Sequence, residues 1–228
     1  MNTLIQTILV PQGAEYRAVC RGLRGVVEPP TVLPTPAGAA ISPYLRSLQT
    51  ADYFYKGQRV LLMGLCGGLT AKWAIGDAVL YGDSFSPALQ TPNSKLYACD
   101  RNLTAELQSR LNVPIVQSVT SDRVISTIHD KQQLATQFNA DVVDMESAAA
   151  LEILNAIGVS AAILRVVSDD CHHNIPNLSH AFNAEGSLQP VALAIALLRQ
   201  PIAATHLIRG SLHGLKNLQA LTQRLFTF

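Results

Sequence analysis

The 228-residue sequence has few charged residues and almost no excess of either sign. Charged residues make up 14% of the chain, and 17 lysines and arginines against 16 aspartates and glutamates give a formal net charge of +1. Without a basic or acidic excess, the protein has no field that would attract nucleic acid or an acidic partner. We therefore expect no nucleic-acid partner.

Cysteine is also scarce, and its spacing excludes a disulfide framework. The four cysteines are scattered without a CxxC pair: Cys20, Cys66, Cys99 and Cys171. Such usage is typical of reduced thiols in a cytosolic protein. The one Cys/His cluster, in which His172, His173 and His180 follow Cys171, matches no zinc pattern. We expect a cytoplasmic protein with no metal and no cofactor.

Long hydrophobic runs are absent as well. The apolar run at 4–10 contains Gln6 and Thr7, is followed by Pro11 and has no basic leader before it, which predicts a buried strand rather than a signal peptide. The longest apolar segment, VALAIALL at 191–198, is far shorter than the roughly 20 residues of a membrane-spanning helix. We expect a soluble protein without stable membrane insertion.

What the sequence does contain is an alternation of short apolar β-rich runs with helical patterns. The expected strands lie at 4–10, 59–64, 78–83, 113–119 and 161–167, and the expected helices at 14–24, 38–50, 102–111, 130–138 and 146–157. The Pro-rich piece at 28–38 is interpreted as an irregular connection. The alternation predicts an α/β layer fold with a sheet buried on both faces, in a single domain over 1–228.

After Pro176 the chain is expected to become helical, with a C-terminal helical tail at about 188–228. Leucines recur in that tail at helical spacing: Leu207, Leu212, Leu215, Leu218, Leu221 and Leu225. This pattern fits a helix packed on its own domain. A basic amphipathic helix that contacts a partner or a membrane surface is the alternative.

Two segments could bring a ligand to the carboxyl end of a strand. GLCGGL at 64–69 follows an expected strand, but its GxxGG spacing fits neither the dinucleotide fingerprint nor the phosphate loop. It is either a set of tight turns or a ligand loop. ILRVVSDDCHH at 163–173 carries a strand into Ser168 and Asp169, which form either a ligand site or a helix cap. Arg165 within this apolar strand requires an anionic or multiply hydrogen-bonding partner, so a structural ion pair is the alternative to a site.

Two further acids stand near expected helix starts. Glu146 lies in VVDMESAAALEIL at 142–154, where a carboxylate could simply cap the helix. Glu15 follows the first strand and, taken alone, is interpreted as a solvated residue at a helix start. The sequence pattern alone does not decide whether either acid also has a role in a binding or catalytic site.

Taken together in order, four segments resemble the purine nucleoside phosphorylase and nucleosidase superfamily: GLCGGL with the following GDAVL, TSDRVI at 120–125, VVDMESAAA at 142–150 and LRVVSDD at 164–170. DMES and RVVSD are most similar to methylthioadenosine/S-adenosylhomocysteine nucleosidases. The short chain and its helical tail resemble the hopanoid-associated phosphorylase branch. The resemblance implies a three-layer α/β/α sandwich around a mixed sheet, and a homodimer or higher homo-oligomer.

The resemblance also implies how a purine nucleoside would be held. Glu146 would accept hydrogen bonds from both ribose hydroxyls, and Met145 would pack against the sugar. The backbone around Val124 and Ile125 would line the base site, and Gly67 of the glycine-rich segment would contact the substrate.

Catalytic roles follow from the same resemblance. Asp169 would pass a proton to N7 of the departing purine, with Ser168 orienting it. Glu15 would act as the general base, and Arg165 would help to hold the nucleophile. Negative charge from Glu146 under the sugar would stabilise the positive charge that develops there.

Phosphorylases of this superfamily carry a serine and an arginine where this sequence has Leu65 and Gly76. An apolar side chain supplies neither the charge nor the donors that a phosphate dianion needs. We therefore expect an N-glycosidase that uses water and releases adenine from a 5′-substituted adenosine. A phosphate-dependent purine nucleoside phosphorylase is one alternative. Nucleosidases also carry a serine at the position of Leu65, so a non-catalytic nucleoside-binding member is another.

Overall fold

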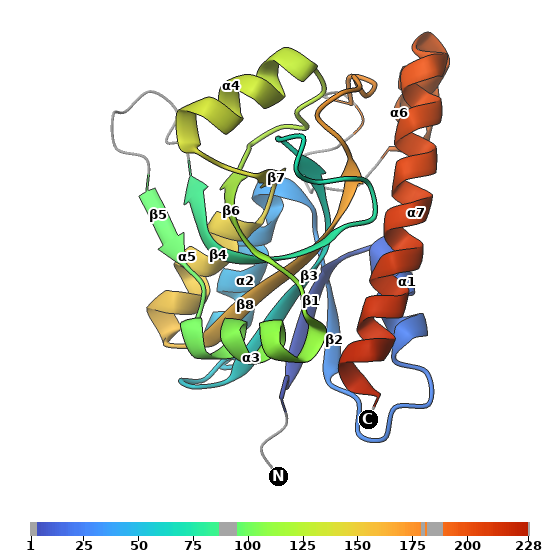
Figure 1. Ribbon diagram of the computed structural model, residues 1–228. Coiled ribbons are helices and arrows are strands. Elements are labelled where there is room, and N and C mark those ends of the chain that lie inside the picture. Colours follow the sequence, from blue (N-terminus) through green and yellow to red (C-terminus); the bar gives the residue numbers. More distant parts are fainter. Residues whose placement is uncertain (1–3, 87–94, 179–180, 182–188, 228) are drawn as a thin grey trace.

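The computed structural model describes residues 4–86, 95–178, 181 and 189–227, and its strands and helices alternate along most of the chain (Figure 1). The strands are β1 (Thr7–Pro11), β2 (Thr31–Thr35), β3 (Arg59–Gly68), β4 (Ala78–Ser86), β5 (Lys95–Ala98), β6 (Ile115–Thr120), β7 (Val142–Asp144) and β8 (Ser160–Asp169). The helices are α1 (Ala14–Gly22), the 3₁₀ turn η1 (Gly38–Ala40), α2 (Ile41–Thr50), α3 (Arg101–Leu111), α4 (Ile128–Phe138), α5 (Ser147–Ile157), α6 (Pro190–Arg199) and α7 (Pro201–Phe226).

The strands form one eight-stranded sheet with parallel and antiparallel pairs. Its order is β2-β1-β3-β7-β6-β4-β5, and β8 pairs with both β3 and β4. Because β3 also pairs with β7, and β7 with β6, the strands β3, β8, β4, β6 and β7 close into a ring. The mixed sheet expected from the resemblance is confirmed, and the ring brings several strand ends to one place.

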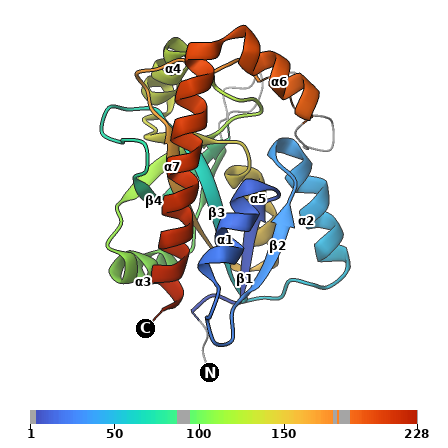
Figure 2. The ribbon, with the colours of Figure 1, turned by 90° about the vertical axis from the view of Figure 1, so that its right-hand side faces the viewer.

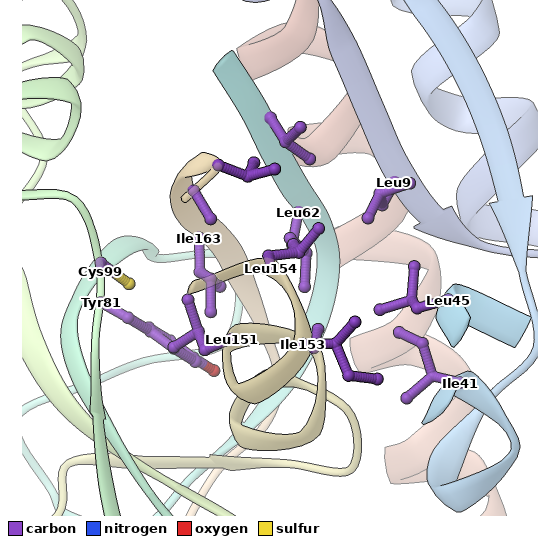
Figure 3. Packing of buried hydrophobic residues seen from close by; sticks show 14 of the residues in the cluster. Leu9, Ile41, Leu45, Leu62, Tyr81, Cys99, Leu151, Ile153, Leu154 and Ile163 are labelled. Atoms are coloured by element: carbon purple, nitrogen blue, oxygen red, sulfur yellow. The ribbon is translucent and has the colours of Figure 1, made fainter. Parts of the chain in front are cut away.

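Helices cover both faces of this sheet. Successive residues of a strand point to opposite faces, so Leu62 and Ile163 pack with α2 and α5, while Leu61 and Leu164 pack with α1, α3 and α7. Figure 3 shows the first of these clusters, with Leu62 and Ile163 facing α5. Burial on both faces confirms the three-layer α/β/α architecture.

Three strands lie where the sequence did not predict them, and β3 extends beyond its expected end at 64. The interpretation of 28–38 as irregular was wrong, because β2 pairs in parallel with β1. Pro34 is tolerated there since β2 is an edge strand and needs no second ladder. The glycine-rich segment does not follow a strand either, since β3 continues to Gly68. The strands β5 and β7 are four and three residues long, too short for a periodic signal.

The C-terminal helix α7 packs against α1, α3, β3 and β8 (Figure 2). Its buried face includes Gly210, Gly214 and Leu218. The leucine pattern placed Leu212 on this face, but Leu212 is 63% exposed because the glycines occupy the contact positions. The helical tail expected at about 188–228 corresponds to α6 and α7, whereas the described residues 176–178 are not helical. Within the described ranges, every helix is too short or too polar to cross a membrane.

Candidate functional site

A cavity of about 270 Å³ opens where β1, β3 and β8 end. Its wall includes most of the residues that the sequence predicted for a nucleoside site: Glu15, Gly67, Val124, Ile125, Met145, Glu146, Ser168 and Asp169. Arg165 is 1% exposed and lies behind this wall, bonded to Glu146. The sheet and the helix α1 therefore gather side chains that are as far as 154 positions apart in the sequence, from Glu15 to Asp169.

The helix that follows Glu146 is capped by a different acid. Asp144, at the end of β7, accepts hydrogen bonds from the backbone N–H groups of Glu146 and Ser147 at 3.3 and 3.1 Å and from the Ser147 hydroxyl. Glu146 occupies the cap position of α5 but makes no capping hydrogen bond with its side chain. Its carboxylate is therefore available to the pocket.

Both oxygens of the Glu146 carboxylate have partners in the protein. Oε1 accepts a hydrogen bond from the Gly38 backbone N–H at 2.8 Å, and Oε2 faces Arg165 Nη2 at 3.3 Å. Burial raises the pKa of Glu146, an effect that Arg165 opposes and Asp144 reinforces. Each carboxylate oxygen has a second lone pair, so Glu146 can still accept hydrogen bonds from a ligand.

Arg165 is the centre of a buried group of acids. Its Nη2 lies 3.1 Å from Asp144 Oδ2 and 3.3 Å from Glu146 Oε2. Burial alone would lower the pKa of Arg165, but Asp144 and Glu146 raise it above its usual value. Among the described residues, no group accepts a hydrogen bond from Nε or Nη1. A buried guanidinium with free donors can bind a water molecule or a polar ligand atom.

Glu15 is not the solvated helix-start residue that its position alone suggested. Its Oε1 accepts a hydrogen bond from the Leu65 backbone N–H at 2.7 Å. Gly64 makes room for this arrangement, because a Cβ there would lie 2.8 Å from Glu15 Oε1 and would collide with Arg165 Nη1. Burial raises the pKa of Glu15 to about 7, with Leu65 N–H and Arg165 acting against it and Glu146 with it. Such a carboxyl can exchange a proton near neutral pH.

Asp169 lies at the end of β8, on the wall of the same pocket as Glu146. Its Oδ2 accepts from the Ser168 hydroxyl at 3.2 Å, and its Oδ1 pairs with the Lys131 ammonium. A Cβ on Gly67 would lie 3.1 Å from Oδ1, so the missing side chain leaves space for this carboxyl. Burial raises the pKa of Asp169, although Lys131 and Ser168 both lower it.

The rest of the wall is largely apolar. Ile125 is 7% exposed and lies in the loop after β6 with Val124. Met145 lies close to η1, since its Cε would be 3.2 Å from a Cβ on Gly38. Leu178 and Leu207 complete the opening. An apolar slot with a few polar groups is the usual form of a small-molecule site.

Two residues of this site were missed by the sequence analysis. Asp144 was treated only as part of the DMES segment, although the aspartate three residues before Ser147 is a capping pattern that could have identified its role. Lys131 carries no local signal, because a lysine in an expected helix is normally on the solvated face. Its contact with Asp169 spans 38 positions.

The histidines near Asp169 do not form a metal site within the described ranges. No group of three or more His, Cys, Asp or Glu side chains there could hold an ion. His173 Nδ1 instead lies 2.9 Å from Asp170 Oδ1, and its ring stacks on His206 of α7 at 4.2 Å. His180, the other histidine of the cluster, lies outside the described residues.

The two positions expected to bind phosphate in a phosphorylase have different surroundings. Leu65 lies on the pocket wall, and its Cδ2 also approaches α7, 2.9 Å from where a Cβ on Gly214 would be. Gly76 is covered by α7 instead: Asn217 Nδ2 donates to its carbonyl at 3.0 Å, and a Cβ would lie 2.5 Å from His213. Gly76 also has a φ of 97°, which a residue with a side chain rarely adopts.

Comparison with known proteins gives matches over most of the chain. The sequence model of the phosphorylase superfamily matches residues 10–199. Futalosine hydrolase from Thermus thermophilus is 28% identical over 129 residues, which cover 49% of this chain and 57% of that protein. The chain therefore spans little more than half the length of this curated relative.

Solved structures with the same fold include several nucleosidases. The 5′-methylthioadenosine/S-adenosylhomocysteine nucleosidase of Helicobacter pylori has a TM-score of 0.65 at 17% identity, covering 94% of this chain and 96% of its own. Futalosine hydrolase of the same organism has a TM-score of 0.66 at 17% identity, with 94% and 95% covered. A putative nucleosidase of Borrelia burgdorferi bound to adenine has a TM-score of 0.70 at 14% identity, with 96% and 98% covered. At these identities the likeness concerns the fold.

Proposed function

The chain belongs to the phosphorylase superfamily, as its motifs predicted, and from this we propose that it is a nucleosidase that releases adenine from a 5′-substituted adenosine. The observation that carries the proposal is the presence of Glu146 and Asp169 on the wall of one cavity, each in a different environment. Carboxyl groups that are held differently can take different roles in one reaction. The nucleosidases among its structural relatives support the same class of reaction.

In this proposal Glu146 binds the ribose. Because Asp144 caps α5, the Glu146 carboxylate can accept hydrogen bonds from the two vicinal hydroxyls. Met145 precedes it on the wall and packs against the sugar. Cleavage of an N-glycosidic bond builds positive charge on the ribose, and a buried carboxylate beside it stabilises that charge.

Asp169 is the proposed general acid. A purine anion is a poor leaving group, so a proton delivered to N7 lowers the barrier by an amount typical of general acid catalysis, about 10²–10⁴-fold in rate. The raised pKa of Asp169, which burial causes, favours the protonated form that this task needs. Ser168 donates to Oδ2 and so orients the carboxyl. Val124 and Ile125 flank the base.

Glu15 is the proposed general base, and water is the proposed nucleophile. A carboxyl with a pKa of about 7 is partly ionised at neutral pH and can accept a proton from water. The free Nη1 of Arg165 lies beside Glu15, next to Gly64, and can donate to the same water. The Leu65 N–H that holds Glu15 is a backbone group, so it does not depend on the serine that nucleosidases have there.

The charge around Arg165 argues against phosphorolysis. One guanidinium faces the carboxyls of Asp144 and Glu146, and Glu15 adds a third acid nearby. A phosphate dianion placed here would meet excess negative charge, which costs free energy in a buried site. At Gly76, α7 occupies the space that an arginine side chain would need.

The experiment is a substrate panel with purified protein. Methylthioadenosine, S-adenosylhomocysteine, adenosine and futalosine are incubated with and without phosphate, and free base is followed by chromatography. We expect base release without phosphate, and the Asp169→Asn variant purified in parallel controls for contaminating nucleosidases. Strict dependence on phosphate with formation of a ribose 1-phosphate would contradict hydrolysis. Calorimetric binding of these nucleosides without any product over hours would support the non-catalytic alternative.

We also propose that the chain forms the homodimer or higher homo-oligomer that the resemblance implies. The helix α6 has no buried residue, and Val191, Leu198 and Ile202 are 74–80% exposed. Exposed apolar side chains that gather on one part of a surface are typical of association sites. Size-exclusion chromatography with light scattering measures the mass, and a monomer at assay concentrations would contradict this part of the proposal.

A further inference from the structure

Lys131 is the one lysine whose side chain is completely buried among the described residues, at 0% exposure. A lysine is almost never fully buried unless it is paired, because removing an ammonium from water costs several kcal/mol. Its Nζ contacts two acceptors, Asp169 Oδ1 and the Asp170 carbonyl oxygen. The lysine is therefore directed at the acid that we propose as the proton donor.

The position of Lys131 relative to Asp169 is fixed from both sides. Lys131 lies in the second turn of α4, whose first turn is bonded to the loop that follows Asp169: Ile128 N–H donates to Asn174 Oδ1 at 2.8 Å. The same loop donates from Ile175 N–H to the Ser126 carbonyl at 2.9 Å. The start of α4 and the loop after β8 are thus joined by hydrogen bonds, and these bonds hold Lys131 Nζ next to Asp169 Oδ1.

Lys131 is absent from the pocket wall, whereas Asp169 forms part of it. The lysine therefore does not line the ligand cavity itself, and the Asp169 carboxyl connects it to the cavity. A purely structural role explains the pair poorly, since a buried ion pair is weak evidence for stability and an apolar side chain of similar volume often stabilises as well or better. An amine next to a carboxyl can exchange a proton with it, which an apolar residue cannot do.

We propose that Lys131 is a positioning residue that holds Asp169 and resupplies the proton that this carboxyl passes to the leaving purine. This role rests on the proposed nucleosidase function. The pair starts as ammonium and carboxylate. Asp169 first takes a proton from Nζ, and as the C1′–N9 bond breaks and its electron pair moves to the purine, Asp169 passes that proton to N7. Lys131 is left as a neutral amine beside the carboxylate.

The remaining protons balance. The attacking water gives its oxygen to C1′, keeps one hydrogen as the new hydroxyl and gives one proton to Glu15. After the products leave, Glu15 releases its proton to solvent and the amine of Lys131 regains one from solvent. The raised pKa of Asp169 is consistent with a carboxyl that accepts a proton readily during the cycle. Because the ammonium and the carboxyl are in contact, the transfer needs no movement of α4 or β8.

The test is a double-mutant cycle with Lys131→Met, Asp169→Asn and the double variant, assayed on the best nucleoside of the panel. We expect Lys131→Met to lower kcat by about 10²-fold or more, within the range of general acid catalysis, with KM nearly unchanged. Because the lysine acts through the carboxyl, the double variant should be no slower than Asp169→Asn alone. Lys72→Met, at a side chain 76% exposed, is the matched control and should keep full activity.

A change of leaving group separates proton supply from general damage to the pocket. 4-Nitrophenyl β-D-ribofuranoside releases a phenolate that needs no proton on N7, so Lys131→Met should cleave it nearly as fast as the wild type does. Equal loss on both substrates, or further slowing of Asp169→Asn by the second mutation, would overturn the role of Lys131. Urea unfolding of each variant identifies loss of fold. If the wild type cleaves no nucleoside at all, the proposed function fails first, and the role of the lysine fails with it.

Discussion

Two buried cations pair with acids that line the pocket, and they differ in how many acids surround them. Arg165 faces Asp144 and Glu146 and has Glu15 nearby, whereas Lys131 forms an ion pair with Asp169 alone. An arginine does not lose its proton in a protein, but a lysine can. The Arg165 group is therefore suited to keep a fixed excess of negative charge, and the Lys131 pair is suited to move a proton.

This difference matches the two halves of the proposed reaction. Negative charge is useful where the ribose becomes positive, and a mobile proton is useful where the purine departs with an electron pair. In the proposed reaction, the choice of cation thus separates charge stabilisation from proton transfer. Each prediction below tests one side of this contrast.

The largest effect on kcat is expected for Asp169, the proposed proton donor. Replacing Asp169 with Asn keeps the size of the side chain but removes the acid, so kcat should fall by about 10²–10⁴-fold. Nucleoside binding should change little, because Glu146 and Met145 are unaffected. Steady-state kinetics and calorimetry measure the two quantities. Retention of full kcat by the variant would show that another group protonates the base.

The next effect is on the stability of the protein, where replacing Arg165 and replacing Lys131 should differ. Arg165→Met leaves Asp144 and Glu146 buried without a cation, and breaking a buried pair in this way should lower the free energy of unfolding by about 3–5 kcal/mol. Lys131→Met should cost much less, since Asp169 is on the pocket wall and can take up a proton. Urea unfolding of both variants checks the order.

Arg123→Met is the matched control for this comparison, because Arg123 is 57% exposed and its pair with Asp130 spans 3.5 Å. A surface pair of this kind contributes about 0–1 kcal/mol. Equal destabilisation by Arg165→Met and Arg123→Met would contradict the view of Arg165 as the centre of the acidic group.

A smaller effect, with a distinct pH dependence, is expected for Glu15. The base must be ionised, and its pKa is raised to about 7, so kcat/KM should rise with pH through about 7 and level off above it. Glu15→Gln should lose this acid limb and be about 10²-fold slower at pH 8. Initial rates between pH 5 and 9 test this. An unchanged acid limb in the variant would assign the limb to another group.

Much of the fold followed from the sequence because burial on both faces leaves nearly continuous apolar runs, as in 161–167 of β8, where Arg165 is the one interruption. The strand β2 was missed because its proline is typical of a loop. An edge strand with one partner tolerates Pro34, so the proline does not exclude a strand there. The end of β3 was missed because glycines in GLCGG resemble turns. There they serve instead to let Arg165, Glu15 and the Asp169 carboxyl come close to the strand.

The site was partly predictable for a similar reason. Glu146 and Asp169 stand in the motifs that carry the resemblance, which could therefore predict them as candidates, and both lie on the wall of one cavity. Lys131 could not be found in this way. Its contact with Asp169 depends on how α4 packs against the end of β8, and no local sequence pattern predicts that packing. In the same way, the leucine pattern of α7 could not reveal that glycines form its closest contacts.

Those glycines give the smallest predicted effect. A Cβ on Gly210 would collide with the Ser168 carbonyl oxygen, which is backbone next to Asp169, whereas a Cβ on Gly214 would first meet the flexible end of Leu65. Alanine favours a helix over glycine by about 1 kcal/mol, but overpacking costs about 1–3 kcal/mol. Because the collision at Gly210 is with backbone, its cost lies in the upper part of that range, and Gly210→Ala should be destabilised by a net of about 1–2 kcal/mol, with slower turnover because Asp169 shifts. Gly214→Ala, the matched control, should unfold near the wild-type urea midpoint, since Leu65 can change rotamer. If the two variants have the same stability and turnover, the close approach of α7 to β8 does not position Asp169. The position of the Asp169 carboxyl must then come from Lys131 and Ser168 alone.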